Sequence, residues 1–132
     1  MDEKVKLLLD THAFIWWDSE PSKLGRRALH ACCDPANEVL FSVASAWEME
    51  IKRQLGKLRL RMPLQEIVEQ QRAANGIGLL DVRLPHVIQL DSLPTPHKDP
   101  FDRILVAQAI VEGATLVTAD PAIEVYPVPV LW

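Results

Sequence analysis

The 132-residue chain is 48% hydrophobic and carries a formal charge of -4 at pH 7. This hydrophobic content is enough for one core, and the lack of a Gly/Ser-rich linker or repeat predicts a single domain spanning residues 1–132. No apolar run approaches the roughly 20 residues that span a membrane, and Met1-Asp2-Glu3-Lys4 does not resemble a signal peptide, so we expect a cytoplasmic protein without a membrane partner.

The first predicted element is a strand over residues 5–9 that ends on a carboxylate. Its apolar run is too short for a helix and stops at Asp10-Thr11, which is typical of a buried strand in a parallel sheet. Ligands of open α/β sheets bind beyond the carboxyl ends of the strands, which places Asp10 for chemistry. Asp is also a preferred N-cap, and a helix is expected over residues 13–17, so the structural and functional interpretations of Asp10 both stay open.

The next part of the chain predicts a second helix and another strand–helix unit. A helix is expected from Pro21 to the break at Asp34-Pro35, and its adjacent cysteines, Cys32 and Cys33, exclude a disulfide framework or a cysteine-based zinc site. A strand is expected over residues 38–42 and a helix over residues 42–57. The predicted core face of that helix carries Ala44, Trp47, Ile51, Leu55 and Leu58, with Glu48 at its border.

The second half of the chain predicts the remaining layers. Helices over residues 64–73 and 85–90 flank a strand over residues 76–82. Asp99 before Pro100 is a strong helix start, and the apolar helix that follows should be buried and end at Gly113. Strands are expected over residues 115–118 and, at an edge where prolines are tolerated, over residues 128–131. Alternating strands and helices predict an α/β fold, a three-layer α/β/α domain with a mostly parallel central sheet.

Four acids occupy comparable positions at one end of this sheet, namely Asp10, Glu48, Asp102 and Asp120. Each also has a structural interpretation: Asp10, Asp99 and Asp120 fit N-caps, Ser45-x-x-Glu48 fits a capping box, and Glu48 can pair with Lys52. Carboxylates that meet in a crevice cannot all stay ionised unless protons or a cation neutralise them. Carboxylate oxygens suit Mg²⁺ or Mn²⁺, and two such ions can activate a water against a phosphodiester, so the cluster predicts a metal-dependent hydrolytic site.

Other site chemistries find less support in the sequence. Glycosidases also use paired carboxylates but favour exposed aromatic residues, whereas Trp16, Trp17, Trp47 and Trp132 are expected to pack in the core. The histidines lack the spacing of a zinc helix and are expected at the surface or in turns. They are His12, His30, His86 and His97, of which His12 and His97 are expected at the pocket mouth.

A basic segment follows the second predicted strand–helix unit. Five of the fourteen Lys and Arg residues fall within ten positions, at Lys52, Arg53, Lys57, Arg59 and Arg61. This cluster fits a basic flank beside an acidic pocket, and it equally fits a solvated helix end with cations near its C-terminus.

The ordered acidic motifs resemble those of the PIN-domain proteins, specifically the VapC-like toxins of type II (VapBC) toxin-antitoxin systems. The resemblance rests on Leu7-Leu8-Leu9-Asp10-Thr11-His12, Ser45-Ala46-Trp47-Glu48, His97-Lys98-Asp99-Pro100-Phe101-Asp102-Arg103 and Leu116-Val117-Thr118-Ala119-Asp120, and it continues to the closing Pro127–Trp132. It implies a Mg²⁺- or Mn²⁺-dependent endoribonuclease toxin that cuts RNA, is neutralised by a small VapB-like antitoxin and forms a homodimer.

The resemblance also assigns roles to individual residues. Asp10, Glu48, Asp102 and Asp120 match the catalytic and metal-binding quartet of the family, and Thr118 matches its small hydroxyl residue. Asp10 and Asp102 would be the principal metal ligands, Glu48 a ligand or an orienter of the attacking water, and Asp120 a ligand acting through water. Asp99 is an additional acid that we interpret as a cap.

Two alternatives remain. A catalytically silent PIN-like module could bind RNA or protein with the same fold, and metal-dependent cleavage would exclude it. A phosphoaspartyl phosphatase would use Asp10 as nucleophile, but such enzymes generally carry a second Asp two residues on, where this chain has His12. An amphipathic antitoxin segment would fit an apolar groove lined by the early helices, although Phe14, Trp16 and Trp17 equally fit the core.

Overall fold

The computed structural model describes residues 4–94 and 99–132 and is built on a five-stranded parallel sheet. The strand order is β3-β2-β1-β4-β5, and every neighbouring pair is parallel. The strands are β1 (Lys6–Leu9), β2 (Glu38–Ser42), β3 (Gly78–Leu80), β4 (Thr115–Val117) and β5 (Val130–Leu131). The predicted parallel sheet and the edge position of the proline-flanked last strand are thus confirmed.

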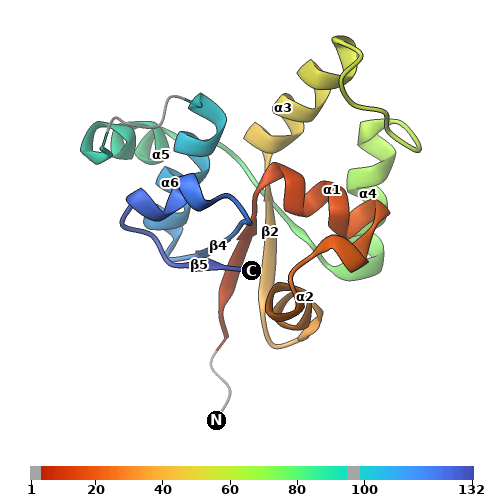
Figure 1. Cartoon of the computed structure of the whole chain (residues 1–132), viewed down its shortest axis with the longest axis horizontal. Coiled ribbons are helices and arrows are strands. Elements are labelled where there is room, and N and C mark those ends of the chain that lie inside the picture. Colours follow the sequence, from red (N-terminus) through yellow and green to blue (C-terminus); the bar gives the residue numbers. More distant parts are fainter. Residues whose placement is uncertain (1–3, 95–98) are drawn as a thin grey trace.

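Helices cover both faces of the sheet, which confirms the three-layer α/β/α fold (Figure 1). α1, α2 and α4 lie on one side, α5 and α6 lie on the other, and α3 projects from the end of β2. The helices are α1 (Thr11–Ser19), α2 (Arg26–Cys33), α3 (Val43–Gln54), α4 (Leu64–Asn75), α5 (Leu84–Gln89) and α6 (Pro100–Glu112), with 3₁₀ turns η1 (Pro21–Lys23), η2 (Leu90–Ser92) and η3 (Pro121–Val125).

The central strand β1 contributes to the core on both faces. Leu7 and Leu9 belong to one apolar cluster, together with Phe14 of α1, while Leu8 joins a second cluster with Leu105 of α6. Successive side chains of a strand point to opposite faces, so three consecutive buried leucines can serve two cores. Because all strands are parallel, their carboxyl ends lie along one edge of the sheet, where Asp10, α3 and Thr118 follow β1, β2 and β4.

The second helix begins later than the sequence predicts. Pro21–Lys23 forms the separate turn η1, and α2 starts only at Arg26, because Leu24 adopts an extended conformation that buries its side chain in the core. Gly25 then packs against Trp132 so closely that a Cβ would lie 2.4 Å from the Trp132 carbonyl carbon. Cys32 and Cys33 lie on α2 as expected, the first buried and the second exposed.

The predicted core face of α3 is correct for Ala44 and Leu58 but wrong for Trp47 and Leu55. Trp47 is 64% exposed and Leu55 is 63% exposed, whereas the buried residues of this helix are Ala44, Ser45, Glu48 and Met49. Apolar spacing gave the wrong phase because two polar side chains, Ser45 and Glu48, are buried by hydrogen bonding with α1. The expectation that all four tryptophans pack in the core therefore fails for Trp47, while Trp16, Trp17 and Trp132 are partly buried against the core.

The remaining observations concern two histidines and the lengths of the helices. His86 is completely buried rather than at the surface, and the predicted location of His97 falls outside the described residues. In the part of the chain that the structure describes, no helix is both long and apolar enough to cross a membrane.

Candidate active site

Asp10 leaves β1 at the centre of the sheet edge and caps α1. Its Oδ1 accepts a hydrogen bond from the Ala13 amide at 2.8 Å, so the N-cap interpretation is confirmed. The side chain is nevertheless buried, with Asp10 only 9% exposed. Burial raises the pKa of Asp10, and the nearby charge of Asp120 adds to this, while the hydroxyl of Thr118, the Ala13 amide and His12 counteract it. Asp10 is therefore a cap and, at the same time, a carboxylate whose negative charge a cation would stabilise.

Thr118 joins two of the predicted acids. Its hydroxyl donates to the Asp10 carboxylate and accepts the Asp120 backbone N–H at 3.1 Å. Asp120 itself is exposed and caps η3, where its Oδ1 accepts the Ala122 amide at 2.9 Å. The structure thus brings Asp10 and Asp120 together around one buried hydroxyl group.

Glu48 reaches the same region from α3. Thr11, the residue after Asp10, donates from Oγ1 to Glu48 Oε1 at 2.6 Å, and Ser45 Oγ lies 3.1 Å from the same hydroxyl. The other oxygen of Glu48, Oε2, is 2.9 Å from Lys52 Nζ, as the helical spacing predicted. Glu48 is 7% exposed, so its charge is held by a hydroxyl on one side and a cation on the other. The predicted capping box is wrong, because Ser42 rather than Ser45 caps α3.

Asp102 occupies the first turn of α6, beside the start of α3. Asp99 caps this helix by accepting the Phe101 amide at 2.9 Å, which confirms our interpretation of that additional acid. The ring of Phe101 packs against Trp47 with a centroid distance of 5.3 Å, so the residues directly before Asp102 and Glu48 are in contact.

A buried polar network fixes α3 relative to α6. Ser42 Oγ accepts the Ala44 amide at 3.0 Å and donates to Gln108 Oε1 at 2.6 Å. Gln108 is completely buried, and its Nε2 donates to the Asp81 carbonyl at 3.2 Å and lies 3.4 Å from His86 Nδ1. This network connects the cap of the helix that carries Glu48 with the middle of the helix that carries Asp102.

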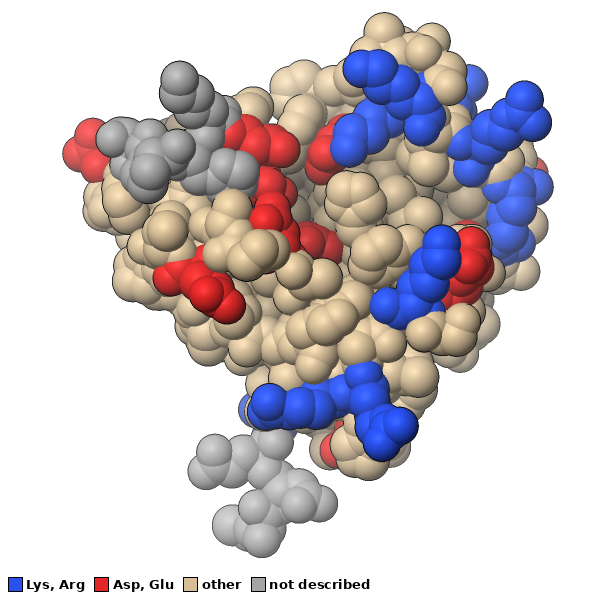
Figure 2. Space-filling view, viewed as in Figure 1, with Lys and Arg blue, Asp and Glu red and all other residues tan. Residues whose placement is uncertain are grey.

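Figure 2 shows Asp and Glu side chains around a hollow on one face of the molecule, with basic side chains to one side of it. Asp and Glu side chains gather near the centre of this face, and Lys and Arg side chains collect at its upper right. Within the basic segment, Lys52 pairs with Glu48, Arg53 with Glu50 and Arg61 with Asp18. Lys57 and Arg59 have no ion-pair partner among the residues that the structure describes, so they are available to an external anion.

The donor chemistry of the hollow suits a hard divalent cation. In residues 4–94 and 99–132, no three His, Cys, Asp or Glu side chains converge closely enough to hold a metal ion by themselves. Mg²⁺ commonly uses one or two carboxylates and keeps several water ligands, so the buried Asp10 and its acidic neighbours fit an ion held partly through water.

Sequence reasoning identified Thr118 but missed the roles of two other hydroxyl groups. Thr11 holds Glu48 and lies 3.1 Å from the Ser45 hydroxyl, yet neither hydroxyl group was predicted to contact this carboxylate. The one available signal is spacing: Ser45 lies three residues before Glu48 and therefore shares its helix face.

Comparisons with known proteins agree with this architecture. The family model described as "PIN domain" matches residues 7–128. The chain belongs to the PIN-domain family. It is 31% identical over 121 residues to Ribonuclease VapC22 from Mycobacterium tuberculosis, an alignment that covers 86% of each chain.

Solved structures show the same fold at lower sequence identity. A chain of VapBC2 from Rickettsia felis, bound to a DNA fragment from their promoter, matches with a TM-score of 0.73 and 16% identity, over 96% of this chain and 98% of that chain. FitAcB from Neisseria gonorrhoeae matches with a TM-score of 0.59 and 19% identity, over 96% of each chain. The chain that carries the four predicted acids therefore shares the fold of these structures, and one relative of the chain is a named ribonuclease.

Proposed function

We propose that this protein is a metal-dependent endoribonuclease and acts as the toxin of a toxin-antitoxin pair in the cytoplasm. The observation that carries the proposal is the buried Asp10 carboxylate: Thr118, which bonds it, also accepts the backbone N–H of Asp120, and Thr11, the next residue in the chain, bonds Glu48. Such an arrangement is costly without a cation and suited to one. The similarity to Ribonuclease VapC22 supports RNA as the substrate.

The roles of the side chains combine the family resemblance with their surroundings. Asp10 and Asp102 are the principal ligands for Mg²⁺ or Mn²⁺, and Asp120, which is exposed, acts through water. Glu48 orients the attacking water or contributes a ligand, because Thr11 and Lys52 fix both of its oxygens. The ion, when bound, supplies an activated water and neutralises charge on the phosphodiester.

The basic flank suits the backbone of an RNA substrate. Lys57 and Arg59 can pair with phosphates, while Lys52 both holds Glu48 and adds positive charge near the hollow. Contacts of this kind position a nucleic acid without reading its sequence.

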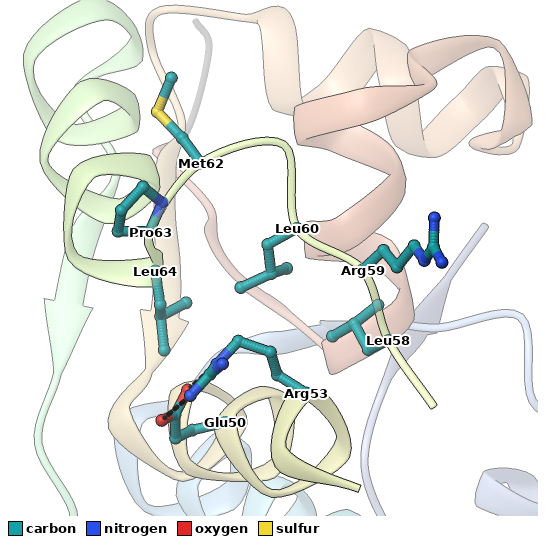
Figure 3. Close-up of a pocket in the computed structure, with 8 residues that line it drawn as sticks. All are labelled: Glu50, Arg53, Leu58, Arg59, Leu60, Met62, Pro63 and Leu64. Carbon is teal, nitrogen blue, oxygen red and sulfur yellow. Dashed lines mark hydrogen bonds and ion pairs between the residues drawn. The ribbon is translucent and has the colours of Figure 1, made fainter. Parts of the chain in front are cut away.

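An antitoxin helix has a suitable surface on this chain. A depression of about 750 Å³ lies between the end of α3, the following segment and the start of α4 (Figure 3). Its apolar lining comes from Leu58, Leu60, Met62, Pro63 and Leu64, with Arg53 and Arg59 beside them. An amphipathic helix fits such a groove, and an acidic residue on it would pair with Arg59, since Arg53 is already paired with Glu50 of the same lining. This groove uses α3 and α4 rather than the earliest helices.

We also propose a homodimer, by analogy with the family.

The test is cleavage of total RNA, including transfer RNA, by antitoxin-free protein in Mg²⁺ or Mn²⁺ and in EDTA. We expect metal-dependent cleavage that Asp10→Asn and Asp102→Asn abolish. Asn caps helices as well as Asp, so Asp10→Asn should keep its fold, which circular dichroism checks. Retained cleavage in either purified variant would overturn the site assignment.

A catalytically silent PIN-like binding module is the second candidate. It is favoured by the absence, within the described residues, of three converging ligand side chains. RNA binding without cleavage in either metal would establish this alternative.

A further inference from the structure

An aromatic pair, the exposed Trp47 of α3 and the half-buried Phe101 of α6, lies where the two site helices meet. The rings of Trp47 and Phe101 have centroids 5.3 Å apart and an interplanar angle of 76°. Trp47 keeps 64% of its surface exposed, although it lies in the first half of α3, a helix that packs against α1 and α6. An indole left in water beside a second ring is a surface available for a planar apolar ligand.

Both rings are adjacent in sequence to proposed site carboxylates. Trp47 precedes Glu48 and Phe101 precedes Asp102. Consecutive residues on a helix point about 100° apart, so the helix turn that directs Glu48 inward to Thr11 directs Trp47 outward. The aromatic pair therefore borders the acids without taking part in their hydrogen bonds.

We propose that Trp47 and Phe101 form a base-stacking subsite, which holds the nucleobase next to the phosphodiester that is cleaved beside the carboxylates. This inference rests on the proposed ribonuclease function and adds a recognition element to it. Unpaired bases stack on aromatic side chains whatever their sequence, and cations beside such a platform follow the phosphate backbone. Lys52 lies five residues beyond Trp47 on α3, and Lys57 and Arg59, which have no ion-pair partner among the described residues, follow the end of that helix and can contact phosphates further along the strand.

A second copy of the chain fits this position less well. A symmetric contact places the same patch of both subunits face to face. Here it would bring together two copies of the start of α6, where Asp99 and Asp102 flank Phe101, and like charges across an interface are costly. A single-stranded RNA instead brings a base for the rings and negative charge for the nearby cations.

The test measures binding separately from cleavage. In the Asp10→Asn background, fluorescence anisotropy follows a labelled single-stranded oligoribonucleotide with Mg²⁺ present. Adding Trp47→Ala should weaken binding by about 5- to 100-fold, the usual effect of losing one stacked base, whereas Trp47→Phe should retain most of the affinity. Leu55→Ala is the matched control, because Leu55 is equally exposed on α3 but away from the rings; we expect less than about a 2-fold change.

A series of oligonucleotides with one abasic residue at successive positions then locates the stacked base. At one position, the abasic residue should weaken binding to the Asp10→Asn protein by the same factor as Trp47→Ala does. The affinity of the double variant, Asp10→Asn with Trp47→Ala, should not change when that base is removed. The subsite is refuted if Trp47→Ala binds every oligonucleotide normally or if Leu55→Ala loses as much affinity. It is also refuted if light scattering shows a dimer that Trp47→Ala dissociates, since a second copy would then cover the rings.

The same measurements separate this inference from the proposed function. If the wild type cleaves RNA but Trp47→Ala has no effect on RNA binding, the subsite alone is refuted. Trp47-dependent RNA binding by a protein that cleaves nothing would refute the ribonuclease and retain the subsite. Neither binding nor cleavage would refute both.

Discussion

Asp10 and Asp120 are two carboxylates with the same local role and different surroundings. Each follows a strand of the parallel sheet and caps the next helical segment, through amide hydrogen bonds of 2.8 Å and 2.9 Å. Asp10 is 9% exposed, whereas Asp120 lies open to solvent. The strand-then-acid pattern thus determines where a carboxylate is placed along the edge but not how much water reaches it.

The difference arises from what covers each acid. β1 is the central strand, and α3 packs over the start of α1 through Thr11, Ser45 and Glu48. β4 is followed only by the short turn η3, which leaves Asp120 uncovered. Burial consequently raises the pKa of Asp10, and its ionised form is maintained by Thr118 and the Ala13 amide. We infer that Asp10 is positioned in advance for a metal, while Asp120 can adjust to it.

The largest expected difference between the two acids is in cleavage. Asp10→Asn should lower kcat by at least about 10³-fold, because it removes a direct ligand, and Asp120→Asn by about 10- to 100-fold, as for a residue acting through water. Single-turnover cleavage of one RNA at saturating Mg²⁺ measures both. Equal losses would show that the difference in burial has no catalytic meaning.

Thr118→Val should change the pH dependence of cleavage. The Thr118 hydroxyl lowers the pKa of Asp10, so its loss raises that pKa and moves the acid limb of the pH–rate profile to higher pH. We expect about a 10-fold loss near neutrality that partly recovers in more alkaline buffer. Thr115→Val, the same change at the start of β4, is the control and should leave the profile in place.

A smaller effect is expected on stability. Because the pKa of Asp10 is raised above its ordinary value of 3.8, its ionisation costs stability as pH rises, and the cost disappears below that value. In EDTA at pH 7, Asp10→Asn should therefore have a higher Tm than the wild type, and the gap should close on acidification. Asp120→Asn should show no such gap. A lower Tm for Asp10→Asn at pH 7 would contradict this account.

The smallest effect concerns capping by the exposed acid. Asp120→Ala should lower the free energy of unfolding by at most about 1 kcal/mol, and Asp120→Asn should restore it, because Asn also caps. Urea denaturation of the three proteins in EDTA measures this. A larger loss would indicate that Asp120 supports more of the fold than η3.

Local signals in the sequence predicted most of the fold. β1 follows from a short apolar run ended by Asp10, and α6 follows from Asp99-Pro100 at its start and Gly113 at its end, where φ is +65°. These features depend on neighbours in the chain, so the sequence contains them directly. The positions of Asp10 and Asp120, which follow β1 and β4 as caps, were predicted for the same reason.

Features that depend on distant partners were not predicted. Glu48 is buried because it meets Thr11, 37 residues away, and Ser42 meets Gln108, 66 residues away. Such hydrogen bonds allow polar side chains to replace apolar ones in a helix core, and this moved the buried face of α3 away from Trp47. The burial of His86, which lies 2.9 Å from Glu112 through Nε2, has the same origin.

The hydrogen bond from Ser42 to Gln108 also has a consequence for how the molecule opens. Because Ser42 must release Gln108 before the first turn of α3 can unwind, and Gln108 lies in the fully buried middle of α6, the two helices should open as one cooperative unit. The amide hydrogen of Ala44 should then exchange with deuterium as slowly as those in the centre of α6, although helix ends ordinarily fray.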